Sequence, residues 1–247
     1  MQWSSLPVGL SVAMIALAAV PAQAVTVQVD TFAIGDLAGA RSARDAFLSG
    51  AASVVSEGFE SFAAWDGTSG TPTPIDTGVG LFRSDAPPPG SGGSSVGGGT
   101  TGEIRADGPM FGRQNLTDGG ANWLDSNDLE TLVWEVGGAG TFKSLSFFLT
   151  DVGDIAGTDF NFSVTAGSES ATTHIPRQAS GTINFVRILF DAPVTTALVT
   201  FNTQHNDGFG LDDATAAAPI PLPGAGLLLL GGLAGFAALR RRGQTVA

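Results

Sequence analysis

Residues 141–150, TFKSLSFFLT, decide the fold class, because this run is rich in Phe, Leu and Thr and is bounded by Gly and Asp. Its apolar residues alternate imperfectly, which predicts a strand that is buried on both faces or interrupted by a bulge. Similar apolar runs recur at 132–136, 160–165, 183–190 and 197–201, with Gly, Asp and Asn between them. Such spacing is typical of an antiparallel β-sandwich, and we expect a jelly-roll-like one.

The N-terminal part of the same domain adds one strand and one helix. Residues 25–34 alternate Val with polar residues, which predicts a half-buried strand. An Ala-rich stretch over 37–52 follows Asp36, which predicts a short helix capped by that aspartate. Residues 67–102 are rich in Pro, Gly and Ser and predict a long flexible loop. We therefore expect a single all-β domain over 25–218 with one short N-terminal helix.

The composition excludes several classes of function. The chain has 247 residues and no Cys, which removes disulfide frameworks, thiolate metal sites and cysteine nucleophiles. It has 23 acidic and 11 basic residues, for a net charge of -12. An acidic surface repels phosphate backbones, so we expect no nucleic-acid partner.

Residues 1–24 have the features of a secretory signal peptide. The stretch 8–20 is mostly apolar and carries no charge, and the small residues Ala22 and Ala24 fit a cleavage site. The segment differs from the usual pattern in having no Lys or Arg before the apolar stretch, so its positive charge comes from the terminal amine. We expect the domain to be exported.

Residues 219–247 form a second targeting segment. A proline-rich motif precedes residues 224–239, which carry no charge and, as a helix, would measure about 24 Å, slightly less than a typical hydrocarbon core. Snorkelling of the arginines that follow would let this helix span a membrane with the chain end in the cytoplasm. The sequence therefore predicts a membrane-anchored precursor.

The order of these features resembles the PEP-CTERM sorting signal, and the proline-rich motif resembles its Val-Pro-Leu-Pro-Ala variant, with Ile in place of Val and Gly in place of Ala. The resemblance implies a Gram-negative bacterium, processing by an exosortase, and delivery to the cell surface or extracellular matrix. It covers only the tail, and an ordinary C-terminal membrane anchor is the alternative. The residues that carry it are Ile220, Pro221, Leu222, Pro223 and Gly224, with the cluster Arg240, Arg241 and Arg242.

Two acidic segments far apart in the sequence suggest a calcium site. Residues 58–60, Gly-Phe-Glu, and residues 208–213, which end in Asp-Asp, resemble the opening and closing strands of jelly-roll carbohydrate-binding modules. The resemblance implies a structural calcium ion with Glu60 and Asp213 as its first ligands. Asp212 and Glu57 are second choices, because successive strand residues point to opposite faces. The alternative is that these acids belong to solvated faces.

Tryptophans are candidates for sugar binding, because a flat ring can stack on the apolar face of a pyranose. Trp65 and Trp123 lie among polar and turn-forming residues, so we expect both in loops and take both as candidate platforms. Burial beneath a loop is the alternative for each. Trp134 lies in an apolar run, which predicts that it belongs to the core.

We find no catalytic motif and expect a protein that is not an enzyme. His174 and His205 are not accompanied by a Gly-x-Ser-x-Gly elbow, and no hydrolase motif surrounds the acidic residues. The expected function is that of an exosortase-sorted, non-catalytic surface or matrix protein associated with exopolysaccharide. A calcium-stabilised carbohydrate-binding module with a specific glycan ligand is the alternative, and an extracellular glycoside hydrolase is a third hypothesis.

Overall fold

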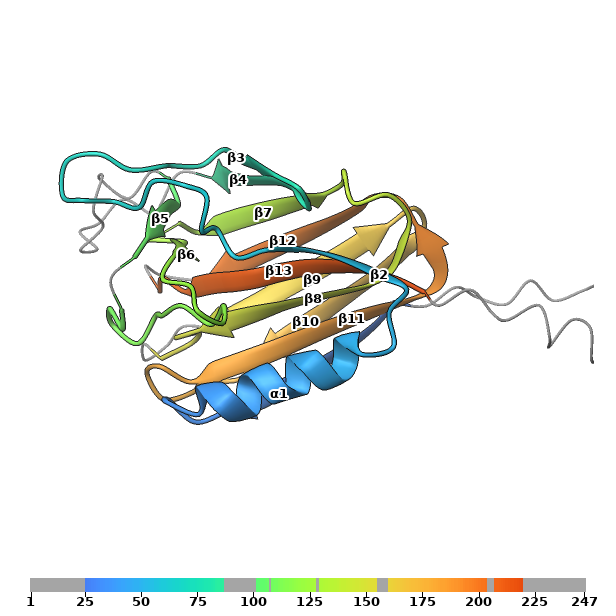
Figure 1. Ribbon diagram of the computed structural model, residues 1–247, viewed down its shortest axis with the longest axis horizontal. Helices are drawn as coiled ribbons and strands as arrows, with labels where there is room; N and C mark the ends of the chain where they lie inside the picture. Colours follow the sequence, from blue (N-terminus) through green and yellow to red (C-terminus); the bar gives the residue numbers. More distant parts are fainter. Residues whose placement is uncertain are drawn as a thin grey trace, which may run out of the picture.

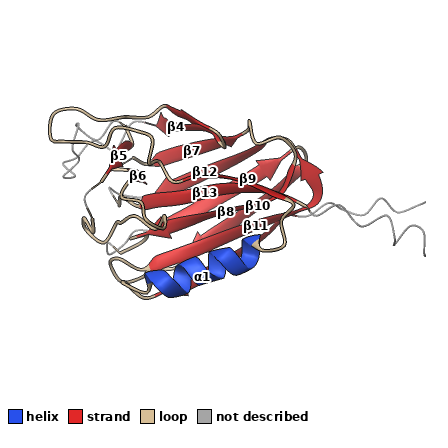
Figure 2. Ribbon diagram, viewed as in Figure 1, coloured by secondary structure: helices blue, strands red, loops and turns tan. Residues whose placement is uncertain are grey.

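Two antiparallel sheets pack face to face, and a single helix lies against the outside of one of them (Figures 1 and 2). The computed structural model describes residues 25–86, 101–106, 108–127, 129–154, 160–203 and 207–219. The predicted signal peptide and the tail from residue 220 onward lie outside these residues. The expected β-sandwich with one short helix is confirmed.

The first sheet has seven strands. In spatial order these are β1 (Val25–Phe32), β11 (Ile183–Val194), β8 (Phe142–Thr150), β13 (Gly210–Ala218), β6 (Trp123–Asp125) and β5 (Glu103–Arg105), while β2 (Ser53–Glu57) pairs with β13 beside them. The second sheet has six strands, in the order β10 (Glu169–Ile175), β9 (Phe160–Ala166), β12 (Ala197–Thr203), β7 (Thr131–Val136), β4 (Gly80–Ala86) and β3 (Ile75–Thr77).

The run that predicted the fold becomes β8, near the middle of the seven-stranded sheet, and it is buried on both faces as expected. Phe147 points into the sandwich, where its ring meets those of Trp134 and Phe201 edge to face, with centroid distances of 6.0 and 5.3 Å. Phe148 belongs to the separate cluster beneath the helix. Trp134 is fully buried, as predicted, and its indole N–H donates to the carbonyl of Val79 at 3.1 Å.

The helix α1 (Leu37–Leu48) covers the outer face of the seven-stranded sheet. Asp36 caps it, as expected, by accepting a hydrogen bond from the amide of Gly39 at 3.0 Å. Phe47 packs edge to face on Phe185 of β11, with ring centroids 6.0 Å apart. The helix ends four residues before the predicted limit, because Ala52 already pairs with Ala218 at the start of β2.

The predicted loop over 67–102 is wrong in part, because it contains strands β3 and β4. Gly80, at a φ of 120°, allows the tight turn that joins them. Phe82 then enters the core and stacks on Trp134 with centroids 5.4 Å apart. The turn-forming residues that suggested a loop therefore mark one hairpin, while residues 87–100 lie outside the described part of the chain.

A β-bulge interrupts β13 where it pairs with β8. Asp212 lies opposite Phe148 and Thr215 opposite Ser146, so β13 has one residue more than its partner between these positions. Asp213 occupies the bulge with a φ of 54°. A bulge breaks the strict alternation of side chains, so neighbouring residues can turn toward the same layer.

Candidate functional site

The outer face of the six-stranded sheet carries a band of small neutral polar side chains. In β9, Phe162 and Val164 point into the core, whereas Asn161 and Ser163 between them are partly exposed on the other face. This is the alternation of a strand with one dry and one solvated face. The polar residues of β10 and β12 lie on the same outer face.

Strand register aligns these side chains in two rows. Thr172 of β10, Ser163 of β9 and Thr200 of β12 lie opposite one another across three strands. His174, Asn161 and Asn202 form the next row in the same way. Neighbouring strands lie about 4.8 Å apart, so each row presents hydrogen-bonding groups at a regular short spacing.

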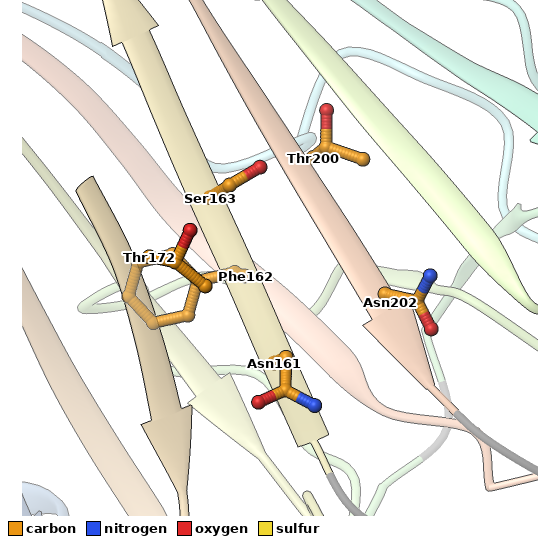
Figure 3. A pocket seen from close by; sticks show the side chains of 6 residues that line it. All are labelled: Asn161, Phe162, Ser163, Thr172, Thr200 and Asn202. Atoms are coloured by element: carbon orange, nitrogen blue, oxygen red, sulfur yellow. The ribbon is translucent and has the colours of Figure 1, made fainter. Parts of the chain in front are cut away.

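The two rows enclose a shallow hollow of about 340 Å³ (Figure 3). Figure 3 shows the hydroxyl and amide groups of the three strands around it, with the ring of Phe162 closing it from the core side. The side chains that line it are Asn161, Phe162, Ser163, Thr172, Thr200 and Asn202. At its edge the Nδ1 atom of His174 lies 3.1 Å from the Oδ1 atom of Asn161.

The lining groups are donors and acceptors without formal charge. Hydroxyls both donate and accept, and each Asn amide offers an oxygen acceptor and two N–H donors. Among the described residues that line the hollow, none carries a carboxylate. These residues offer hydrogen bonds to an uncharged polar ligand.

The predicted calcium ligand Glu60 binds backbone instead. It follows β2 in a turn, and its Oε1 atom accepts hydrogen bonds from the amides of Ala121 and Asn122, both at 2.9 Å. The side-chain amide of Asn115 donates to the same oxygen at 3.1 Å. Glu57, also a predicted ligand, accepts from the amide of Phe59 at 2.6 Å, and burial raises its pKa.

Asp212 and Asp213 face the layer formed by α1 and the loop 115–122. The Oδ2 atom of Asp212 accepts from the amides of Leu116 and Thr117, the latter at 2.9 Å. Burial raises the pKa of Asp212 to about 8, although these hydrogen bonds act in the opposite direction. Asp213 forms an ion pair with Arg44 of α1. The expectation that the two aspartates point to opposite faces is wrong. The bulge at Asp213 interrupts the alternation of side chains along β13, so both aspartates face the same layer.

The contacts of Glu60, Asp212 and Asp213 fit hydrogen bonding and ion pairing better than calcium binding. The oxygens of Glu60 and Asp212 already accept N–H groups, and Asp213 faces a guanidinium rather than a second acid. Among the described residues, no group of three or more acidic or histidine side chains is arranged to hold a metal ion. Calcium at this position stays a prediction from the sequence alone, and the contacts of these acids weigh against it.

The two tryptophan candidates differ. Trp65 lies in a loop, as predicted, and is partly exposed. Trp123 lies in β6 and is fully buried, so its predicted loop position is wrong. Its surroundings explain the difference: β6 lies between β13 and β5, and the indole packs close to Gly210. Trp65 alone can present a ring to solvent.

The sequence analysis missed the hollow, although a signal for it was present. Residues 160–164, Phe-Asn-Phe-Ser-Val, alternate regularly and place two polar side chains on one face. The partners of these side chains come from strands ten and forty residues further on, and only the register brings them together. The sorting residues 220–224 and 240–242 lie outside the described part of the chain. Within the described part, no helix has the length and apolar character needed to span a membrane.

No family model and no curated protein sequence matches the chain. Among solved structures it is similar to CBM35 from Cellvibrio japonicus Abf62, at 10% identity and a TM-score of 0.31, covering 68% of this chain and 95% of that one. It is also similar to the CBM22-1–GH10 modules of Clostridium thermocellum xylanase 10B with xylohexaose, at 15% identity and a TM-score of 0.32, covering 67% and 28%. At these scores the likeness carries no argument about a ligand, which must come from the site itself.

Proposed function

We propose that the domain binds a neutral glycan, without catalysis, in the hollow on the outer face of its six-stranded sheet. The observation that carries this proposal is the pair of aligned rows, Thr172–Ser163–Thr200 and His174–Asn161–Asn202. Sugar hydroxyls donate and accept hydrogen bonds, as do the hydroxyls and amides of these rows. The site would sit on rigid strands, so little conformational freedom would be lost on binding.

Two further features favour a neutral glycan. Leu198 precedes Thr200 on the same face of β12 and is 38% exposed, which provides apolar surface beside the polar rows. Glycan sites combine such surface with a few polar groups that fix orientation. The net charge of -12 would repel an acidic polysaccharide. We therefore expect the ligand to be an uncharged polysaccharide rather than an acidic one.

The chemistry of the hollow favours binding over hydrolysis. Most glycosidases use two carboxyl groups, one on each side of the bond that they cleave. The six side chains that line this hollow provide none. A glycoside hydrolase would need a different site.

We further propose that the domain is a jelly-roll-like module delivered to the surface by its tail. Support comes from the motif 220–224 and the cluster 240–242, which resemble an exosortase sorting signal. Changing Pro221 and Pro223 to Ala should leave the protein in the inner membrane, as measured by fractionation. Surface delivery at the normal level would contradict this part of the proposal.

Affinity electrophoresis tests the glycan proposal. The protein is run through gels that contain the host's purified exopolysaccharide or a neutral β-glucan, and we expect retardation in at least one of them. The double substitution Asn161→Ala and Asn202→Ala should weaken binding about tenfold or more, because each lost hydrogen bond contributes about 0.5–1.5 kcal/mol.

Gln28→Ala is the matched control, because it removes an exposed amide from β1, on the other sheet. It should leave the mobility shift unchanged. The variant Trp65→Ala tests the remaining tryptophan platform in the same gels. If Trp65→Ala loses the retardation and the Asn161/Asn202 double variant keeps it, the glycan site lies at the loop that carries Trp65. If no protein is retarded in any glycan-containing gel, the glycan proposal is rejected.

A further inference from the structure

A second hollow lies where two turns meet at one end of the sandwich. A space of about 400 Å³ is bordered by residues 166–169, at the turn between β9 and β10, and by residues 192–196, at the end of β11 and the turn to β12. Its lining includes the hydroxyls of Ser168, Thr195 and Thr196. This space is separate from the polar hollow described above and shares none of its lining residues.

Glu169 is the one ionisable side chain among the described residues of this lining. It is 5% exposed, and its Oε2 atom is buried without a hydrogen-bond partner in the described part of the chain. In β10 the buried positions Glu169 and Ile175 alternate with the exposed Ser170, Thr172 and His174, so Glu169 lies on the inward face. Its carboxylate therefore lies at the end of the core rather than in solvent.

No ion pair in the described part of the chain includes this carboxylate. Six arginines of that part pair with other acids instead: Arg41, Arg44, Arg83, Arg105, Arg113 and Arg187. Burial of a carboxylate is costly unless a cation or a set of hydrogen bonds offsets it. Other buried acids in this protein have such partners, as Asp212 does in the amides of Leu116 and Thr117.

We propose that this second hollow binds a hard divalent cation such as calcium, with Glu169 as its charged ligand. Calcium accepts carboxylate, hydroxyl and carbonyl oxygens and retains water molecules, and the two turns offer oxygens of the first three kinds. The lining contains no nitrogen or sulfur side chain that would favour a softer metal. A single carboxylate gives a weak site, in the millimolar range found in extracellular modules.

Calcium titration of the full-length protein tests this proposal. Thermal unfolding is followed in chelator and in calcium chloride up to 10 mM, and calorimetric titration with calcium chloride measures binding directly. If the dissociation constant is about 1 mM, the unfolding temperature should rise by about 3 °C or more. Glu169→Gln keeps the shape of the side chain and removes its charge, so it should abolish both the rise and the binding heat.

Two comparisons keep the test decisive. In chelator, Glu169→Gln should unfold at the same temperature as the parent or at a higher one, because it replaces an uncompensated buried charge. A clearly lower unfolding temperature would show that the carboxylate has a partner within the protein. That result would overturn the proposal. Asp76→Asn removes an exposed carboxylate from β3 and should keep the full response to calcium. A response absent from the parent, or equal in parent and Glu169→Gln, would also overturn it. Since the readout is stability, its outcome does not depend on glycan binding.

Discussion

Asp212 and Glu60 hold the two ends of one loop. Asp212, on β13, accepts the amide of Thr117 at 2.9 Å, and Glu60, after β2, accepts the amide of Ala121 at 2.9 Å. Arg41 of α1 completes the attachment by donating to the carbonyl of Leu116 at 2.7 Å. The loop 115–122 is thus held on the outside of the seven-stranded sheet by acids that accept from its main-chain amides, and Arg41 links it to the helix.

Removal of the Glu60 carboxylate should release the distal end of this loop. We expect Glu60→Ala to lower the free energy of unfolding by about 1–2 kcal/mol, because it leaves amides without their acceptor. The amides of Ala121 and Asn122 should exchange with deuterium faster, whereas that of Thr117 should keep its protection. Glu130→Gln, at another exposed acid, is the control, and unchanged exchange at Ala121 and Asn122 would contradict the assigned role.

The ion pair between Arg44 and Asp213 should stabilise the bulge. Both side chains are largely buried, at 14% and 9% exposure, so Arg44→Met leaves a charge with little access to water. We expect a loss of about 2 kcal/mol in the free energy of unfolding. Adding Asp213→Asn should recover part of this loss, since Asn tolerates the positive φ of that position and removes the unpaired charge. Additive losses in chemical denaturation would show that the two residues do not interact.

The sandwich could be predicted because the apolar and polar residues within β8 and its neighbouring strands already indicate which positions are buried. The same sequence predicted Glu60, Asp213, Asp212 and Glu57 as calcium ligands, whereas in the structure their carboxylates accept hydrogen bonds or pair with an arginine. The roles of the first three depend on the loop 115–122 and on Arg44, which lie far from Asp212 and Asp213 in the sequence, and on a bulge that appears only where β13 pairs with β8. Trp123 shows the same limit, since the short strand β6, paired between β13 and β5, contains and buries a residue whose local sequence resembles a loop.

Calcium should not act through Glu60 and Asp213. Their oxygens already accept amide N–H groups or face a guanidinium, so we expect Glu60→Gln and Asp213→Asn to leave any calcium-dependent rise in the unfolding temperature unchanged. The measurement is thermal unfolding with calcium or chelator. Loss of the calcium effect in Asp213→Asn alone would restore the metal site predicted from the sequence.

Asp212 should make stability depend on pH in neutral solution. Burial raises its pKa from 3.8 to about 8, so between these values the folded state binds a proton that the unfolded state has released. The free energy of unfolding should therefore fall as the pH rises through this window. Asp151, whose burial raises its pKa to about 6, contributes in the same direction but only in the lower part of the window.

The comparison of Asp212→Asn with Asp151→Asn separates the two groups, because neither variant can ionise at the substituted position. Asp212→Asn should be less stable than the parent at pH 5, because an N–H₂ group replaces one of two accepting oxygens. Oδ2 of Asp212 accepts from the amides of Leu116 and Thr117, and Oδ1 accepts from the amide of Asp213. That deficit should narrow between pH 6 and 8, because only in the parent does the folded state retain a proton at residue 212 that the unfolded state has released. Asp151→Asn should flatten the curve only below pH 6. Urea unfolding at unit pH steps measures both slopes. A deficit of constant size across pH 5–8 would mean that Asp212 is already ionised at pH 5 and that its amide hydrogen bonds outweigh its burial.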